Sequence, residues 1–558
     1  MSSRTHRSRT ALVSTLALAC AVALAALSSS PATAATAHDT IVASGSSWAA
    51  NAVNQWVADV KSSGLRVSFT STGSAQGRKD FASAVTDFAI SDIGYQGSDP
   101  KTGEADTSDR PYAYLPIVGG GTSFPYKILV GGKPVTNLRL SGQTLAKIFT
   151  GGITNWNDAA ITQDNNGRKL PSKPIIPVVH SEGAGSTAQF TQYLAKMFPS
   201  IWTAYNKNPS FTEYYPQSSA VTAVYGSDGV MNYISSKSGD GTIGYDEYSY
   251  PLGLGYPVAK IKNVAGYYVL PDQYNDAVAL TQAQINMDKT SKNYLLQTLD
   301  KVYTYSDPRT YPLSSYSYAV IPTSATDRRM TTPKRQTMAD FLFYSVCGGQ
   351  AAIGATGYSS LPLNLVQASF AQVAKLKAAD PKVDVTSQNP ANCNNPTFDK
   401  RNPSKNHLAE IAPQPAACDK EGAGPCGSGS GGTQTGSGGG SNGSGGGSGG
   451  GGGSNGSGTG SAGGGTSGTG TGSTKTTTGT GTTRTTVNPD TGQVLAAAGG
   501  TGSGTSSDAV ASPTELAAYS RSGNRTPFAV LAVLLLLAAV LTPPLLTQRL
   551  ARRKRSGS

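Results

Sequence analysis

The chain has 558 residues and a formal net charge of +12, from 45 lysines and arginines against 33 aspartates and glutamates. Part of the positive charge lies in basic segments at the two ends, and no basic stripe interleaved with aromatic residues occurs, so we expect no nucleic-acid partner. No cysteine pair has zinc-binding spacing, and we expect neither a metal nor a cofactor.

Residues 1–37 have the composition of a secretory signal peptide. Basic residues precede an apolar run from Ala11 to Leu27, and two A-x-A cleavage sequences end at Ala34 and Ala37. Cys20 allows a lipoprotein site as an alternative, but the apolar run continues past it, so we expect Cys20 to be removed. Export makes disulfide bonds possible in the mature chain.

Residues 38–380 have the complexity of a folded domain, in which short apolar runs alternate with amphipathic ones. The strand-like runs are 67–70, 87–90, 128–130, 175–179, 242–245 and 318–321. The helix-like runs are 49–60, 145–149, 187–197, 231–235 and 338–345. This alternation predicts an α/β fold of two lobes, with helices covering the sheets.

Three loops of small residues each follow a predicted strand and precede a predicted helix. They are Gly45-Ser46-Ser47-Trp48, Thr72-Gly73-Ser74-Ala75-Gln76-Gly77 and Gly183-Ala184-Gly185-Ser186-Thr187. The free N–H groups and the dipole at a helix N-terminus favour oxyanions. Each loop alone is also explained as a turn with a helix cap, but three such loops together indicate an anion site.

Asp92 ends the predicted strand in the run Thr86 to Asp92. A carboxylate at the carboxyl end of a strand faces the crevice in which α/β sheets bind ligands. Because an ionised Asp only accepts hydrogen bonds, it favours an anion that carries a proton and disfavours a fully ionised one. Asp92 therefore predicts selection of hydrogen phosphate over sulfate, and a simple loop cap is the alternative.

With these residues placed, the chain resembles the periplasmic or cell-surface phosphate-binding proteins of ABC phosphate importers. The similarity covers roughly residues 40–370 and rests on VASGSSW, TGSAQGRKDF, TDFAISD, GQTLAKIFTGGITNWNDAAI, PVVHSEGAGSTAQFTQYL, GTIGYDEYSY, YPLSSYSYAV and GYSSLP in this order. The resemblance implies a two-lobed periplasmic-binding-protein-like fold (type II) that closes on its ligand like a hinge. It places lobe 1 at about 38–120 plus 312–380 and lobe 2 at about 121–311, with crossings near 118–124 and 311–316.

The resemblance also implies the phosphate contacts. They fall on Ser47, Trp48, Ser74, Asp92, His180, Gly185 and Ser186. The family pattern in the third loop is Arg-x-Asp-Gly-Ser-Gly-Thr, whereas this chain has His180-Ser181-Glu182-Gly183-Ala184-Gly185-Ser186.

His180 thus takes the arginine position, and Ala184 removes a hydroxyl group that the family uses. In one interpretation His180 is the basic partner of the ligand and titrates near ~6.5. In the other, His180 caps the strand end while Arg78 or another base reaches the anion. The residues leave both interpretations open.

The remaining sequence predicts a tether. Residues 381–426 form a cysteine-containing collar, and residues 427–526 are rich in Gly, Ser and Thr and predict a flexible linker. An apolar run at 527–547 is long enough to span a bilayer, and the basic tail at 548–558 predicts a cytoplasmic C-terminus. A sortase signal is an alternative, but its faint pentapeptide, Asn488 to Gly492, lies far upstream of the apolar run.

Four cysteines remain after export: Cys347, Cys393, Cys418 and Cys426. The last three cluster after the domain, so we expect one bridge among them, Cys393–Cys418. Cys347 lies in an apolar patch and is expected to be a buried thiol. Spacing alone does not determine the pairing.

The sequence therefore predicts a monomeric, membrane-tethered extracellular protein that captures inorganic phosphate and delivers it to an ABC-type permease. The alternative is a surface protein of the same fold that binds another anion or none, with a sensing, scaffolding or adhesion role. Ser186, His180 and Glu182 superficially suggest a phosphatase triad. Their close spacing on one strand–loop turn argues against triad geometry, so we expect no enzyme.

Overall fold

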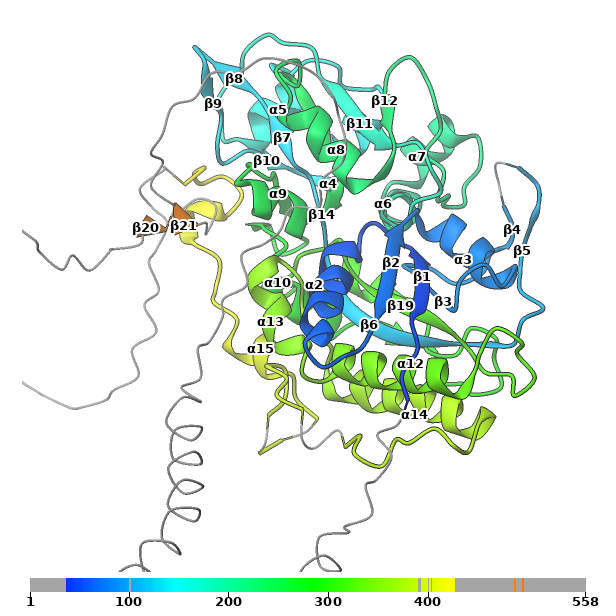
Figure 1. Cartoon of the computed structure of the whole chain (residues 1–558). Helices are drawn as coiled ribbons and strands as arrows, with labels where there is room; N and C mark the ends of the chain where they lie inside the picture. Colours follow the sequence, from blue (N-terminus) through cyan, green and yellow to red (C-terminus); the bar gives the residue numbers. More distant parts are fainter. Residues whose placement is uncertain are drawn as a thin grey trace, which may run out of the picture. The chain divides into compact units, whose positions relative to one another are not determined.

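The computed structural model describes residues 37–99, 102–389, 393–399, 401–402 and 404–426, and the backbone of 486–487 and 494–495 (Figure 1). By contacts the chain divides into a unit Met1–Ala496 and a unit Ala497–Ser558, and the second unit lies wholly outside this description. Residues 1–36 of the predicted signal peptide, the apolar span and the basic tail also lie outside it, as does almost all of the linker. Within the part described, no helix has the length and apolar character to cross a membrane.

The first lobe is built on a six-stranded sheet with the order β14-β6-β19-β3-β1-β2. These strands are β1 (Ile41–Gly45), β2 (Val67–Ser71), β3 (Phe88–Ser91), β6 (Tyr112–Ser123), β14 (Asp246–Glu247) and β19 (Ser314–Pro322). β1 pairs in parallel with β2 and β3, whereas β19 is antiparallel to β3 and β6. Its helices are α2 (Ala50–Lys61), α3 (Ser74–Ala82), α10 (Gln273–Leu280), α12 (Thr332–Val346), α13 (Gln350–Ile353), η1 (Gly354–Thr356) and α14 (Leu363–Ala379).

The second lobe has a four-stranded sheet, β12-β11-β13-β7, and a three-stranded sheet, β10-β15-β16. These strands are β7 (Tyr126–Lys127), β10 (Arg139–Leu140), β11 (Ile176–His180), β12 (Thr222–Val224), β13 (Thr242–Gly244), β15 (Lys260–Lys262) and β16 (Tyr268–Val269). Its helices are α4 (Gly142–Phe149), α5 (Ala159–Asp164), α6 (Gly185–Met197), α7 (Pro199–Asn206), α8 (Gly226–Ser235), α9 (Ser249–Leu254) and α11 (Asp300–Tyr303).

Several short elements complete the fold. They are the two-stranded ladders β4 (Gly97–Ser98) with β5 (Ala105–Asp106), β8 (Leu129–Val130) with β9 (Lys133–Pro134), β17 (Gln284–Ile285) with β18 (Gln297–Thr298) and β20 (Thr486–Val487) with β21 (Val494–Leu495), and the helices α15 (His407–Ile411) and η3 (Ala417–Asp419). All six predicted strands and all five predicted helices overlap elements of the same type. β2 alternates between more and less exposed residues, whereas β3, β13 and β19 are buried along their whole length, as continuous apolar strands inside a sheet are.

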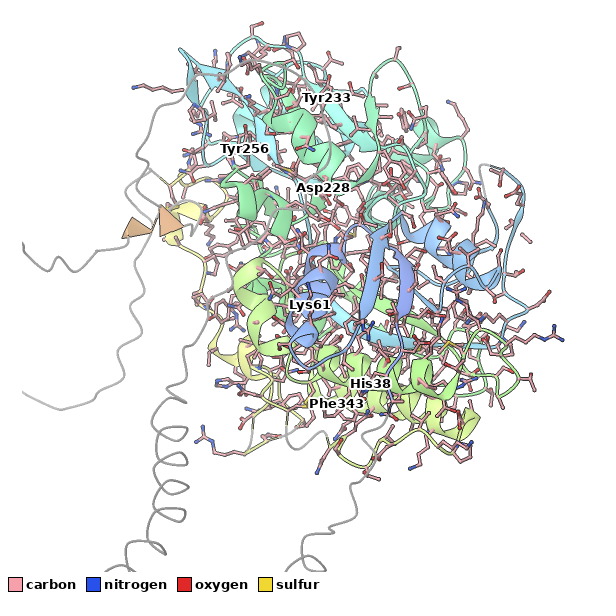
Figure 2. All side chains as sticks on the ribbon, in the orientation of Figure 1. His38, Lys61, Asp228, Tyr233, Tyr256 and Phe343 are labelled. Atoms are coloured by element: carbon pink, nitrogen blue, oxygen red, sulfur yellow. A yellow bond between two sulfur atoms is a disulfide. The ribbon has the colours of Figure 1, made fainter. Side chains whose placement is uncertain are left out.

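Two separate hydrophobic cores support the predicted α/β fold of two lobes. Trp56 and Phe341 lie in the core around the six-stranded sheet, and Trp156 and Phe190 lie in the core of the second lobe. Figure 2 shows the side chains that fill both lobes. Because each lobe buries its own apolar side chains, each lobe is a compact body.

The chain crosses between the lobes at more places than the sequence predicted. One crossing is the passage from β6 to β7, and another is the passage from β13 to β14, because β14 pairs with β6 of the first sheet. In addition, α10 lies within the range expected for lobe 2 but packs against β6 and β19 of lobe 1. These connections place the loops that follow β1, β3 and β11 at the junction of the two lobes.

One bridge forms among the three clustered cysteines, as predicted, but the predicted pair Cys393–Cys418 and the predicted free thiol of Cys347 are wrong. The structure pairs Cys347 with Cys393 and Cys418 with Cys426, with Cα–Cα distances of 4.7 and 5.2 Å. Cys347 ends α12 on the first lobe, and Cys393 packs against the core of that lobe. Cys418 and Cys426 both lie against the second lobe, where they pair with each other. Cys347 is bonded to Cys393 and is therefore not a free thiol.

Candidate anion-binding site

The first small-residue loop joins β1 to α2 and gives two adjacent serines different partners. The hydroxyl of Ser46 donates to the carboxylate of Asp92, at 2.8 Å from each oxygen. Ser47 instead accepts a 2.9 Å hydrogen bond from Ser227 of α8 in the second lobe. The turn needs Gly45, because its φ is 139° and a Cβ there would lie 1.9 Å from the backbone of β3. Only glycine adopts such a φ without steric cost.

Trp48 is the second residue of this loop for which a phosphate contact is predicted, and its side chain is buried in the first lobe. Its indole N–H donates to Thr122 at 3.3 Å, and its ring meets the ring of Tyr358 edge-on at 5.9 Å. Because its single donor is engaged and the side chain is buried, Trp48 supports the loop through packing in this structure.

Asp92 is the centre of the candidate site. Its carboxylate accepts hydrogen bonds from the hydroxyls of Ser46, Ser74 and Ser317, and the side chain is 1% exposed. Burial raises the pKa of Asp92, and the hydrogen bonds from the serines offset part of this shift. Asp92 is thus an acceptor for three hydroxyl groups of the protein, and its predicted contact with a ligand proton stays a prediction.

The third loop meets the same carboxylate. Gly185 begins α6, and a Cβ at this position would lie 1.9 Å from the Asp92 carboxylate. The backbone of α6 therefore approaches Asp92 more closely than any residue with a side chain allows. Ser186 follows, and its hydroxyl is buried without a hydrogen-bond partner among the residues described.

The loops also contact one another. The Ala75 N–H of the second loop donates to the Gly183 carbonyl of the third at 3.1 Å. A Cβ on Gly77 would lie 2.5 Å from the Cα of Gly45 in the first loop. The structure thus brings all three predicted loops together, with Asp92 between them.

His180 ends β11 and is fully buried. Its Nδ1 lies 2.8 Å from an oxygen of Glu182, while its Nε2 has no partner in the described part of the chain. Burial opposes the charged imidazole, but the hydrogen bond and charge of Glu182 and the charge of Asp246 outweigh it and raise the pKa of His180. A protonated His180 with one free N–H can serve an anion.

Asp246 is a site residue that the sequence analysis missed. The ladder between β11 and β13 ends at Val178 opposite Gly244, and Asp246 follows two residues later in β14, near enough for its charge to act on His180. One oxygen of Asp246 is buried without a hydrogen-bond partner among the residues described. Burial raises the pKa of Asp246 to about 7, although the charge of His180 opposes this shift.

Arg78, the alternative cation, is fully buried and already engaged. Its guanidinium donates to Asp106 at 2.8 to 3.2 Å, to Glu213 at 2.6 Å and to Ser91 at 3.1 Å. Each of its three nitrogens has a protein partner, so these contacts do not support the interpretation in which Arg78 reaches the anion. Glu213 belongs to the second lobe, and Arg78 therefore joins the lobes.

Sequence reasoning missed Ser46, Ser227, Asp246, Glu213 and Ser317. Ser46 lies within the first small-residue loop, where the family pattern points to its neighbour Ser47. Ser317, by contrast, is 225 residues from its partner Asp92, and Glu213 is 135 residues from Arg78. No local pattern connects such distant positions.

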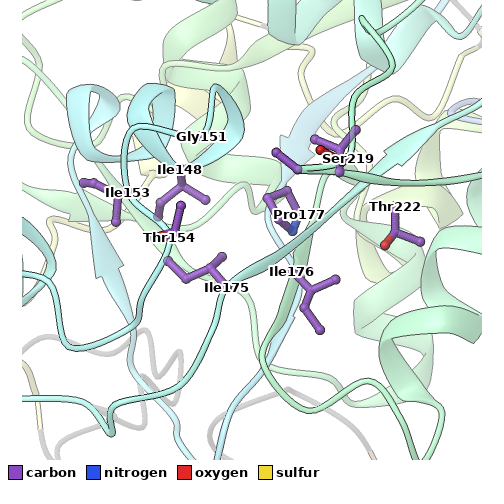
Figure 3. A pocket seen from close by; sticks show the side chains of 11 residues that line it. Ile148, Gly151, Ile153, Thr154, Ile175, Ile176, Pro177, Ser219 and Thr222 are labelled. Carbon is purple, nitrogen blue, oxygen red and sulfur yellow. The ribbon is translucent and has the colours of Figure 1, made fainter.

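A cavity lies elsewhere, on the second lobe (Figure 3). Its volume is about 200 Å³, and its lining residues carry no charge. Most of its wall is apolar and comes from Ile148, Ile153, Ile175, Ile176, Pro177 and Val221. An anion would lose its hydration there without gaining partners, so this cavity is not the predicted site.

Comparison with known proteins gives this geometry a family context. Residues 30–348 match the family model of the PBP superfamily domain. The chain is 29% identical over 325 residues to phosphate-binding protein PstS 3 of Mycobacterium tuberculosis, covering 58% of this chain and 83% of that protein. It is 30% identical over 332 residues to PstS 2 of the same organism, covering 57% and 82%.

Solved structures that the chain matches include a phosphate-binding protein from Stenotrophomonas maltophilia, with 18% identity and a TM-score of 0.45 over 62% of this chain and 99% of that one. Another is a periplasmic phosphate-binding protein, PfluDING, bound with phosphate, with 22% identity and a TM-score of 0.45 over 61% and 93%.

Proposed function

The chain belongs to the PBP superfamily, and we propose that its two-lobed domain captures inorganic phosphate at Asp92 and delivers it to an ABC-type permease. The observation that carries the proposal is the meeting of three serine hydroxyls and the N-terminus of α6 at one buried carboxylate. The relatives at 29% and 30% identity are phosphate-binding proteins, which supports the same ligand.

Selectivity follows from the hydrogen bonds of Asp92. In the structure the serine hydroxyls occupy its lone pairs, so a bound ligand exchanges at least one of them for its own hydroxyl. The displaced serines can then turn and donate to the anion. Hydrogen phosphate carries the required proton, whereas sulfate would place unprotonated oxygens against the carboxylate.

The positive charge comes from His180 and α6. Glu182 orients the imidazole through Nδ1, which leaves the Nε2 N–H for an anion oxygen. α6 has 13 residues, and its N-cap residue Ala184 makes no side-chain cap. Its first N–H groups are therefore free for the ligand. The unpartnered hydroxyl of Ser186 lies at the same helix end.

Lobe closure would remove water from this site. Direct contacts join the lobes around it: Ser227 to Ser47, and Tyr225 to the backbone of Thr72 at 3.1 Å. Excluding water strengthens each hydrogen bond to the anion because the local dielectric constant falls. The contacts of Trp48 hold the first loop in place during this step.

We further propose that the domain is exported, tethered by residues 427–526 and anchored by an apolar span at 527–547, as a monomer with a cytoplasmic tail. This part of the proposal rests on the sequence of segments outside the described residues. A membrane anchor with a cytoplasmic C-terminus explains why a basic tail directly follows an apolar run.

Calorimetric titration of the purified full-length chain in detergent micelles tests the proposal. We expect heat of binding with phosphate and none with sulfate at pH 7.5. Asp228→Asn, on α8, is the matched control and should bind as the parent does. Absence of phosphate binding in the parent chain would overturn the proposal and favour a surface protein with another ligand.

A further inference from the structure

The described residues of 393–426, all except 400 and 403, leave the first lobe and end on the second (Figure 1), and we call them the strap. The strap is held to the first lobe covalently by the Cys347–Cys393 disulfide. Two further contacts secure this end, because Asn395 and Thr397 donate to the carbonyl of Leu361 at 2.9 and 2.8 Å. The first end of the strap is thus part of the first lobe.

The middle of the strap is helix α15, which packs against α10 of the first lobe. The N–H of His407 donates to the carbonyl of Thr397 at 2.8 Å, so the start of α15 is fixed to the first anchor. At its other end, Arg309 donates to the carbonyls of Ala409 and Ala412 at 3.0 and 3.2 Å, and it lies in the passage between α11 of the second lobe and β19 of the first. A cation at the C-terminus of a helix satisfies its free carbonyl groups.

The second end of the strap is a loop closed by the Cys418–Cys426 disulfide. Arg139 of β10 is buried and donates to the carbonyls of Cys418, Lys420 and Ala423, at 3.1, 3.2 and 2.6 Å. The loop thus presents its carbonyl oxygens to one guanidinium, and the disulfide holds its two ends together.

Two ion pairs also hold this loop to β15. Lys260 lies 2.7 Å from Asp419, and Lys262 lies 2.7 Å from Glu421. The N–H of Glu421 adds a backbone hydrogen bond of 2.8 Å to Gly266. The second end of the strap is therefore firmly attached to the second lobe, although without a covalent bond.

The connector between the two ends, Ala412 to Ala416, is extended. The ψ angles of Ala412 and Ala416 are 128° and 145°. Pro413 and Pro415 fix their own φ, and Ala412 and Gln414 each precede a proline and are restricted to extended conformations. Five residues in a polyproline conformation span ~15 Å against a maximum of ~17 Å, so the connector can lengthen by only about 2 Å.

We propose that the strap is a mechanical stop that limits how far the two lobes move relative to each other. Any rotation that separates the two ends of the connector is halted after about 2 Å, unless the second end detaches from the second lobe. The inference rests on the proposed function only in that a ligand-capturing domain opens and closes. It also means that the predicted tether leaves the domain from the second lobe, at Cys426.

The test is to lengthen the connector in the full-length chain. Ten Gly/Ser residues are inserted between Gln414 and Pro415, and the same ten between Gly131 and Gly132 as a control in an open turn. Spin labels are introduced as unnatural amino acids at the exposed positions Lys61 and Lys237, which leaves the disulfides intact. Pulsed electron paramagnetic resonance then gives the interlobe distance distribution without phosphate.

We expect the connector insertion to broaden this distribution by several Å, and the control insertion to leave it as in the parent. Asp419→Ala, which weakens the second attachment without changing length, should broaden it less. Equal widths in all four proteins would overturn the stop. The distance measurement uses no phosphate. Its result can therefore be interpreted even if calorimetry shows that the chain does not bind phosphate.

Discussion

Arg78 of the first lobe donates to Glu213 of the second lobe at 2.6 Å, with both side chains buried. The same guanidinium also holds Asp106 and reaches Ser91, the neighbour of Asp92. The contact between the lobes is therefore connected directly to the candidate site. Burial opposes the charge of Arg78, but its two carboxylate partners outweigh that cost, so the guanidinium keeps its charge at any accessible pH.

Replacing Glu213 with Gln should weaken both closure and stability. Arg78 would keep Asp106 but lose a charged partner, and a hydrogen bond between charged groups contributes about 1.5–3 kcal/mol. Urea unfolding should therefore show a loss of that order, and calorimetry should show weaker phosphate binding. Glu104→Gln, which removes an exposed partner of Lys79, is the control. As a surface substitution it should cost about 0.5 kcal/mol or less.

Asp92→Asn should remove the discrimination between phosphate and sulfate. The amide can donate as well as accept, so an unprotonated anion oxygen is no longer repelled at this position. We expect phosphate to bind at least about tenfold more weakly and sulfate binding to become detectable, which corresponds to about 1.4 kcal/mol or more. Unchanged selectivity in competitive titrations would show that Asp92 does not contact the ligand.

Gly185→Ala should abolish binding, because its Cβ would lie 1.9 Å from the carboxylate of Asp92. Either Asp92 or the start of α6 must move, and both are parts of the candidate site. Gly229→Ala in α8 is the matched control, since its Cβ would make only ordinary contacts at 3.8 Å. Retention of full phosphate affinity in Gly185→Ala would contradict the assignment of this helix end to the ligand.

The sequence predicted the elements and loops correctly because both depend on local patterns. The apolar run and the helical pattern located β11 and α6, and β3 ends directly before Asp92 as predicted, whereas the phosphate contacts stay predictions. The partners of Asp92 and Arg78 come from distant segments, and their proximity follows only from the sheet order. The prediction of the disulfide pairing failed for the same reason. Cys347 lies at the end of α12 and Cys393 lies in the collar, and only the fold brings them together.

Asp246 should make stability depend on pH. Burial raises its pKa in the folded state to about 7, from the ordinary value of 3.8 that an exposed Asp has. Between these values the folded state binds more protons than the unfolded state, so this group makes stability fall as pH rises from about 4 to about 7. Thermal unfolding of Asp246→Asn should show a smaller decline over that window. A parallel decline in both proteins would place the titration elsewhere.

His180 should control the upper pH limit of phosphate binding. Burial opposes its charge, but Glu182 and Asp246 outweigh burial and raise the pKa of His180. The imidazole therefore stays charged above its usual range and loses its proton as pH rises through the raised value. Phosphate affinity of the parent should fall at alkaline pH. Loss of a hydrogen bond to a charged group corresponds to about a 10- to 100-fold weaker affinity.

His180→Arg removes that titration because a guanidinium stays charged and offers a fork that matches phosphate. We expect it to bind phosphate at least as tightly as the parent at pH 6, and about tenfold more tightly at pH 9. His180→Gln, which keeps a donor without the charge, should bind weakly at both values. If parent and His180→Arg lost affinity in parallel between pH 6 and 9, the ligand or another group would be titrating, and His180 would be a structural cap at the end of β11.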